Sequence, residues 1–244
     1  MFSIPLSFLY SLWQVACFIT LVAIPLYLRL VCGLHNFDLS ATKRIRVHCR
    51  RSTASRYLRD TTNLMDYEMK VLQSTVVRTY PDGSGLDYRL QGYAMGILWW
   101  RSTFSMKFLG CGGFWSQCIG GPVSYVLPPG SPSGGFWLRV VDETTTDVTH
   151  TEKYLLPWGT PLGIWIAPLW RVWLQRSMEV EMEIIKESLE WLEGSPENRD
   201  TASRLPRHHP AVARFRSQRY GLLDLAKECM GGAKMHLADC VVYN

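Results

Sequence analysis

The distribution of apolar residues divides the chain into three parts, and the first is almost uncharged. Residues 4–31 (IPLSFLYSLWQVACFITLVAIPLYLRLV) carry one charged side chain, Arg29, and are apolar on every helical face. About 20 such residues are enough to cross a bilayer, and a proline such as Pro25 is tolerated in a membrane helix. We therefore expect an N-terminal transmembrane anchor over residues 1–33. A cleaved signal peptide and a buried soluble helix are the alternatives, but no basic segment precedes the apolar run.

The second part, residues 40–194, begins with stretches that alternate between apolar and polar positions, as half-buried strands do. A short helix is expected from the cap Ser52-Thr53 to Leu58. The sequence Pro-Asp-Gly-Ser-Gly at 81–85 marks a turn, and the strand pattern over 86–109 is interrupted near 92–96. Strands are predicted at 43–49, 66–80, within 86–109 (two strands), at 114–119, 136–141 and 147–156.

From residue 164 onward the hydrophobic period becomes that of a helix. One stripe of this helix is apolar, and the acidic residues Glu179, Glu183, Glu187 and Glu190 lie largely away from it. The stripe consists of Leu174, Met178, Met182, Ile185, Leu189 and Leu192. The helix is predicted to end near Gly194, and residues 195–244 are predicted to form a basic, partly disordered tail.

The order of these elements is a strand, short helices, a run of antiparallel strands and one closing amphipathic helix. In this order it resembles the START-like (SRPBCC, helix-grip) superfamily, which includes aromatic polyketide cyclases, coenzyme Q-binding proteins and lipid-transfer domains. The resemblance covers residues 43–193 and is carried by RIRVHCRRSTASRYLRDTTNLMDYEMKV, DVTHTEKYLLPWG and WRVWLQRSMEVEMEIIKESLEWLE. It implies an α+β fold in which a curved antiparallel sheet wraps around the long C-terminal helix.

The resemblance also implies a deep pocket between the helix and the sheet. The expected lining is aromatic and apolar, which suits a hydrophobic small molecule with few polar groups. The alternative is that most of these side chains are packing residues of the core. The expected ligand-binding residues are Trp100, Phe104, Met106, Phe108, Phe114, Trp115, Trp165, Leu169 and Trp173.

The candidate chemistry lies in DVTHTEKYLLPWG, where His150 and Glu152 share one face of the predicted strand with the apolar Val148 and Tyr154. The opposite face (Asp147, Thr149, Thr151, Lys153) has the composition of a solvated surface. A histidine with an ordinary pKa exchanges protons near neutral pH, and an apolar wall would raise the pKa of the carboxylate toward the same range. We expect this pair to move protons in an aldol-type ring closure, a dehydration or an isomerisation.

Further polar residues of the predicted strands complete the candidate site. Tyr88 and Tyr93 are candidate oxyanion donors, and Arg89 or Arg101 is a candidate partner for an acidic substrate group. In the alternative interpretation, Glu152 pairs with a neighbouring basic residue and His150 is a satisfied residue of the cavity wall.

No cofactor or metal is expected. Gly110-Cys111-Gly112-Gly113 lacks the third glycine of a dinucleotide-binding loop, and Cys111 and Cys118 have no histidine partner for zinc. The seven cysteines are odd in number and show no disulfide framework, as expected for reduced thiols.

The net charge of +5 is unevenly placed. Eight basic residues and one acid, Asp38, lie between Arg29 and Arg59. Because positive flanks stay on the cytosolic side of a membrane, we expect a single-pass protein whose globular domain is cytosolic, with the endoplasmic reticulum as the default membrane. The basic clusters suit anionic lipid headgroups better than nucleic acid.

Together these observations predict a membrane-tethered START-like cyclase or dehydratase that acts on a hydrophobic polyketide or terpenoid intermediate, alongside other biosynthetic enzymes. The alternative is a lipid or quinone carrier without chemistry.

Overall fold

The computed structural model describes residues 13–24, 26–27, 36–94, 98–157, 167–194 and 197. The predicted tail lies outside these residues apart from residue 197, and so does much of the predicted anchor. The described part of the anchor is helical and includes the π-helical turn η1 (Ile19–Ala23). No helix in the described part of the chain is both long enough and apolar enough to cross a membrane.

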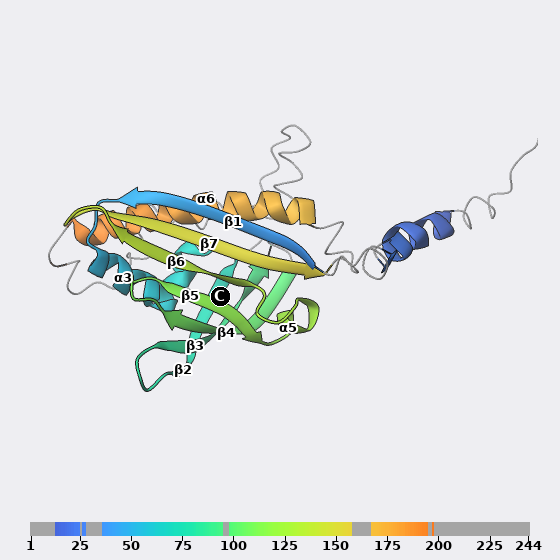
Figure 1. Cartoon of the computed structure of the whole chain (residues 1–244), viewed down its shortest axis with the longest axis horizontal. Coiled ribbons are helices and arrows are strands. Elements are labelled where there is room, and N and C mark those ends of the chain that lie inside the picture. Colours follow the sequence, from blue (N-terminus) through green and yellow to red (C-terminus); the bar gives the residue numbers. More distant parts are fainter. Residues whose placement is uncertain are drawn as a thin grey trace, which may run out of the picture.

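Within the described residues, seven strands form one antiparallel sheet in the order β1-β7-β6-β5-β4-β3-β2 (Figure 1). The strands are β1 (Asn36–Val47), β2 (Val71–Thr79), β3 (Gly85–Ala94), β4 (Leu98–Phe108), β5 (Phe114–Gly120), β6 (Ser133–Val140) and β7 (Thr146–Pro157). The first strand of the chain thus pairs with the last, and the remaining neighbours follow one another as hairpins.

The long helix α6 (Ala167–Glu193) lies along β1 and β7 and buries the predicted apolar stripe against the sheet (Figure 1). Two helices and one 3-10 turn, α3 (Arg51–Arg59), η2 (Thr61–Asn63) and α4 (Leu64–Tyr67), connect β1 to β2, and α5 (Val123–Val126) follows β5. Lys70, immediately before β2, bonds to Glu152 on β7 although four strands separate β2 from β7 in the sheet. The sheet therefore curls around the space beneath α6.

The predicted strands are confirmed apart from their ends, and two local predictions are wrong. Asp66 and Tyr67 belong to α4 and not to a strand, because the N–H of Glu68 donates to the carbonyl of Leu64 and closes a helical turn. Helix α3 begins at Arg51 without a side-chain cap, because the hydroxyl of Thr53 donates to the carboxylate of Glu193 (2.7 Å).

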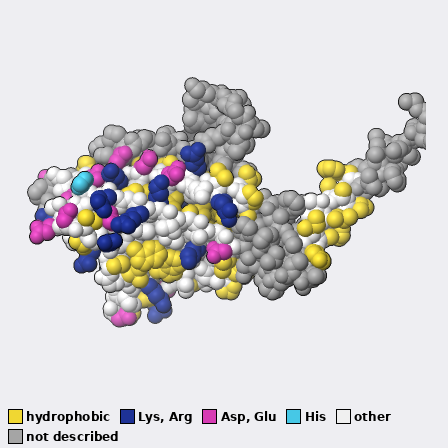
Figure 2. All heavy atoms as spheres, turned by 45° about the horizontal axis from the view of Figure 1, so that its top comes forward, with side chains coloured by type: hydrophobic (Ala, Val, Ile, Leu, Met, Phe, Trp, Pro, Cys, Tyr) yellow, Lys and Arg dark blue, Asp and Glu magenta, His cyan; other side chains and the backbone are white. Residues whose placement is uncertain are grey.

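The outer face of β7 is less solvated than its composition suggested. Asp147 and Thr151 are buried because β7 lies between β1 and β6 in the sheet. Arg44 and Arg46 bond to the Asp147 carboxylate, and Thr151 shares a hydroxyl–hydroxyl hydrogen bond with its neighbour on β1. Figure 2 shows Lys and Arg side chains spread over this face beside a hydrophobic patch.

Candidate functional site

A cavity of about 390 Å³ lies between the inner face of the sheet and α6. Its size falls within the roughly 300–1,000 Å³ that is typical of small-molecule sites. Apolar and aromatic side chains form most of its wall, among them Leu64, Leu90, Trp100, Phe104, Phe114, Phe136, Leu156 and Trp170. Small residues of β5 and β6 form the part of the cavity wall that the sheet contributes. Among them, Ser116 and Gly134 are paired neighbours in the sheet.

One stretch of the wall carries charge. Lys70 places its Nζ 2.8 Å from Oε2 of Glu68 and in bonding contact with Oε1 of Glu152. Oε1 of Glu181, on α6, lies 4.0 Å from the same nitrogen and accepts a hydrogen bond from the N–H of Met69 (3.0 Å). All three carboxylates are buried, so one ammonium group balances a cluster of acids in a region that water hardly reaches.

Burial and the single lysine set different pKa values for these acids. Burial raises the pKa of Glu68 and raises that of Glu181 well above its ordinary value. Burial has the same tendency at Glu152, but Lys70 outweighs it and lowers the pKa of Glu152. Burial also tends to lower the pKa of Lys70, yet the surrounding carboxylates, Glu152 foremost, raise it well above normal. At neutral pH the cluster therefore contains an ammonium at Lys70 and a carboxylate at Glu152, while burial favours the neutral form of Glu181.

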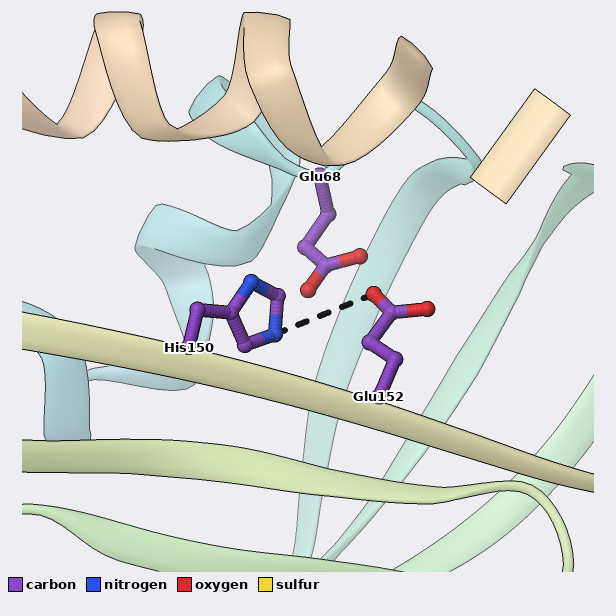
Figure 3. Close-up of side chains that lie close together, drawn as sticks. All are labelled: Glu68, His150 and Glu152. Atoms are coloured by element: carbon purple, nitrogen blue, oxygen red, sulfur yellow. Dashed lines mark ion pairs between the residues drawn. The ribbon is translucent and has the colours of Figure 1, made fainter. Parts of the chain in front are cut away.

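His150 lies beside this cluster, and Figure 3 shows His150 and Glu152 projecting from β7 toward Glu68 beneath α6. Its Nε2 lies 3.8 Å from Oε1 of Glu152, and its ring stacks on Phe136 at a centroid distance of 4.1 Å. Burial lowers the pKa of His150 to about 4, so the imidazole is neutral at pH 7. Among the described residues its Nδ1 has no hydrogen-bond partner.

Two tyrosines extend the polar stretch into the cavity. The hydroxyl of Tyr88 shares a 2.8 Å hydrogen bond with Oγ of Ser116, and both residues line the cavity. Tyr154 donates to Oε2 of Glu152 (3.1 Å). Tyr154 thus holds the carboxylate oxygen that Lys70 leaves free, and the Tyr88–Ser116 pair offers a donor to a bound molecule.

Glu68, His150 and Glu152 also form a candidate metal-ligating group, since one ligand atom from each lies within 4.8 Å of the others. Carboxylate and imidazole ligands suit divalent transition metals. However, the ammonium of Lys70 already contacts both carboxylates. A metal ion would have to displace the ammonium of Lys70 from both carboxylates before it could bind there.

Comparison with solved structures places this arrangement among known folds. A START superfamily protein from Mycobacterium smegmatis matches with a TM-score of 0.50 and 12% identity, over 64% of this chain and 97% of that one. A protein from Thermus thermophilus matches with a TM-score of 0.50 and 18% identity, over 62% and 95% of the two chains. The chain has a START-like helix-grip fold. The Zhui aromatase/cyclase from Streptomyces sp. R1128 has a TM-score of 0.48 and 13% identity, over 68% of this chain and 98% of that one. No protein-family model and no curated protein matches the sequence.

The START-like cavity contains three of the four predicted catalytic residues. His150, Glu152 and Tyr88 line it, whereas Arg101 is exposed and lies outside the cavity lining, because its side chain points to the outer face of β4. The expected rise in the pKa of Glu152 is wrong, because Lys70 pairs with this carboxylate. That pairing is the one that the alternative interpretation proposed for Glu152.

The predicted ligand-binding residues divide into three groups. Trp100, Phe104 and Phe114 line the START-like cavity. Met106 and Trp173 are buried in the core outside the lining, and Phe108 lies beneath the Arg59 guanidinium. Leu169 is exposed on α6, and Trp115 packs with a tilted ring against Trp137 on the outer face of the sheet (5.4 Å between ring centroids). Trp165 lies outside the described residues.

Sequence reasoning missed Glu68, Lys70 and Glu181, which form the centre of the cluster. A signal for Glu181 was present, because it lies seven residues after Leu174 and four before Ile185 and so falls on the buried stripe. Lys70 and Glu68 had no comparable signal, since DYEMK resembles the polar side of a strand.

Proposed function

We propose that the chain is an acid–base catalyst that closes a ring in, or removes water from, a hydrophobic carbonyl compound. The observation that carries the proposal is the buried ammonium of Lys70, held between Glu68 and Glu152 on the wall of an otherwise apolar cavity. Charged groups aimed into a dry site act most strongly on charge that develops during a reaction. Neighbouring acids whose pKa values are shifted in opposite directions by their surroundings are typical of proton-transfer sites.

Each member of the cluster has a distinct role in this proposal. Lys70 remains an ammonium group and therefore does not attack a carbonyl as an amine; it stabilises negative charge on the substrate oxygen. Glu68, whose pKa is raised by burial, gives and takes the proton. Glu152 remains ionised, holds Lys70 in place and is itself held by Tyr154.

The chemistry that suits this arrangement begins at a carbon next to a carbonyl group. Glu68 removes a proton from that carbon, and Lys70 stabilises the resulting enolate. The enolate carbon forms a bond to a second carbonyl carbon, whose oxygen receives a proton; loss of water then gives a conjugated ring. His150 stays neutral beside the cluster and forms an aromatic wall with Phe136 for a flat intermediate.

Proton abstraction can be tested with the ketone 2-tetralone, which fits an apolar cavity and has acidic hydrogens next to its carbonyl. Nuclear magnetic resonance in D₂O measures how fast these hydrogens exchange. The wild-type chain should accelerate exchange, and Glu68→Gln or Lys70→Met should reduce the acceleration by about 100-fold or more. Arg101→Gln, on the outer face, is the matched control and should exchange at the wild-type rate. Equal rates in Glu68→Gln and wild type would refute the catalytic proposal.

A second candidate is a carrier of lipids or quinones without chemistry. It is favoured by the pairing of Lys70 with Glu68 and Glu152, which forms without a substrate. A carrier would bind 2-tetralone, as seen by quenching of cavity tryptophans, and would not accelerate exchange. Mass spectrometry of molecules extracted from the purified chain would then identify the cargo.

The location is a further proposal and rests on the sequence. The uncharged N-terminal stretch would tether the chain to a membrane, with the START-like domain on the cytosolic side, close to a polyketide or terpenoid intermediate that partitions into lipid. Carbonate extraction of membranes that contain the full chain tests the tether: release of the chain into the supernatant would contradict it.

A further inference from the structure

Large apolar side chains are exposed at one end of the cavity. Trp99 is 57% exposed and also lines the cavity, so the cavity reaches the surface beside it. Tyr125 is 89% exposed on α5, two residues after the cavity-lining Val123. Leu169 flanks the cavity-lining Trp170. The apolar rim, as we name this group, consists of Tyr93, Trp99, Ile119, Tyr125, Leu169 and Val172.

Acidic residues are rare in the sequence that forms this end, where Asp38 near the start of β1 is the exposed one among the described residues. None occurs between Asp87 and Asp142, a stretch that contains most of β3, all of β4 and β5, and α5. None occurs between Glu152 and Glu179, which spans the end of β7 and the start of α6. Three basic residues lie close to the rim along these elements: Arg101 two residues after Trp99 on β4, Lys153 near the end of β7, and Arg171 between Leu169 and Val172 on α6. Basic residues therefore outnumber acids in the chain next to the apolar rim.

The N-terminal part of the chain joins the domain at the same end. Asn36, the first residue of β1, pairs with Pro157, the last residue of β7. Figure 1 shows the start of β1, the end of β7, α5 and the start of α6 together at one end of the domain. Thirty-five residues precede β1, and none of the first 28 is charged.

We propose that the apolar rim docks on the surface of a lipid bilayer, so that the mouth of the cavity opens onto the membrane. This inference rests on the proposed function in one respect, namely that the cavity takes a hydrophobic molecule. It adds the route: the molecule passes from the lipid into the cavity without crossing water. Docking buries exposed apolar area and places Trp and Tyr at the depth where they are enriched in membrane proteins.

A bilayer fits these observations better than a protein partner does. The rim borders the opening of a cavity whose lining is mostly apolar. A fluid lipid surface needs no complementary shape, and anionic headgroups are attracted by the basic residues that lie near the rim. The uncharged N-terminal stretch is followed after a few residues by β1, which starts at this end of the domain, so a membrane that held the stretch would lie close to the rim.

Hydrogen–deuterium exchange of the full chain tests the footprint, with and without vesicles of phosphatidylcholine and phosphatidylserine. We expect vesicles to slow exchange about fivefold in 119–127 and 167–173, and to leave the β2–β3 and β6–β7 turns unchanged. The rim variant Tyr125→Ser/Leu169→Ser/Val172→Ser should lose this protection. Its matched control, Val77→Ser/Val140→Ser/Val141→Ser, removes exposed apolar side chains near those turns and should keep it.

The outcomes separate this inference from the proposed function. None of the three side chains of the rim variant lines the cavity, so its vesicle-free exchange of 2-tetralone should equal that of wild type. Loss of the footprint with unchanged tetralone exchange supports docking. Protection that is absent, or that falls on the β2–β3 and β6–β7 turns, overturns it even if catalysis stands. Protection of the rim that grows with protein concentration in the absence of vesicles would identify a second copy of the chain as the occupant and would also overturn it.

Discussion

Removing the ammonium of Lys70 should destabilise the fold in a way that depends on pH. In the wild type, Lys70 contacts Glu68 and Glu152 and lies 4.0 Å from Glu181, and its side chain is only 12% exposed. Lys70→Met keeps much of the side-chain volume and removes the charge. The ionised Glu152 then remains buried without a cation, held only by the hydroxyl of Tyr154.

The expected loss is about 3–5 kcal/mol of unfolding free energy at pH 8, because breaking a buried ion pair leaves an uncompensated charge. The wild-type pKa of Glu152 lies below 4.5, so the stabilisation by this pair is present above that pH and is lost as the pH falls through the lowered pKa. In Lys70→Met, burial alone acts on Glu152 and raises its pKa, so the carboxyl group takes up a proton as the pH falls. The destabilisation should therefore be clearly smaller at pH 5 than at pH 8.

Urea unfolding followed by tryptophan fluorescence at pH 5 and pH 8 measures both values. The double variant Lys70→Met/Glu152→Gln is the control: it carries no unpaired charge at position 152, and should recover much of the stability lost at pH 8. A loss below about 1 kcal/mol at pH 8, or a loss that is the same at both pH values, would refute the reasoning. The first result would mean that the pair is solvated, and the second that Glu152 does not titrate as a buried acid.

Three further predictions concern single residues of the site and the core. The pKa of His150 falls from 6.5 to about 4 on folding, because burial disfavours the charged imidazole. The free energy of unfolding of the wild type should therefore fall by roughly 3 kcal/mol, through this residue, as the pH is lowered from 7 to 4. In His150→Phe, the free energy of unfolding measured by urea titration should change less with pH over that range. The raised pKa of Glu181 means that stability falls as the pH rises above about 4.5. Glu181→Gln should therefore gain stability relative to wild type as the pH rises from 5 to 8; a relative gain that is absent or reversed in thermal melts would show that folding does not raise the pKa of Glu181. Leu189→Ala, at a fully buried position of α6, should cost about 2–5 kcal/mol in denaturant unfolding, and the exposed Leu169→Ala less than about 0.5; similar losses would contradict the packing of α6.

Local patterns predicted most of the secondary structure. The break near 92–96 separated β3 from β4, and the change of period from residue 164 onward located α6, because side-chain direction repeats over a few residues in both kinds of element. The same alternation correctly paired His150 with Glu152 on the inner face of β7. It failed at Asp66 and Tyr67, where the hydrogen bond from the N–H of Glu68 to the carbonyl of Leu64 closes a helical turn despite a strand-like composition.

The sequence by itself determined which faces of β4, β7 and α6 are apolar, and therefore that a sheet must cover a helix, since burial of these faces depends only on the spacing of their residues. Only the tertiary structure decided the electrostatics of the site. The curl of the sheet brings Lys70 from the start of β2 to Glu152 on β7, 82 residues later in the chain, and α6 adds Glu181 from above. Because the pKa of a buried group depends on charges within a few ångströms of it, and not on its neighbours in sequence, the directions in which the pKa values of His150, Glu152 and Glu68 shift follow only from the tertiary structure.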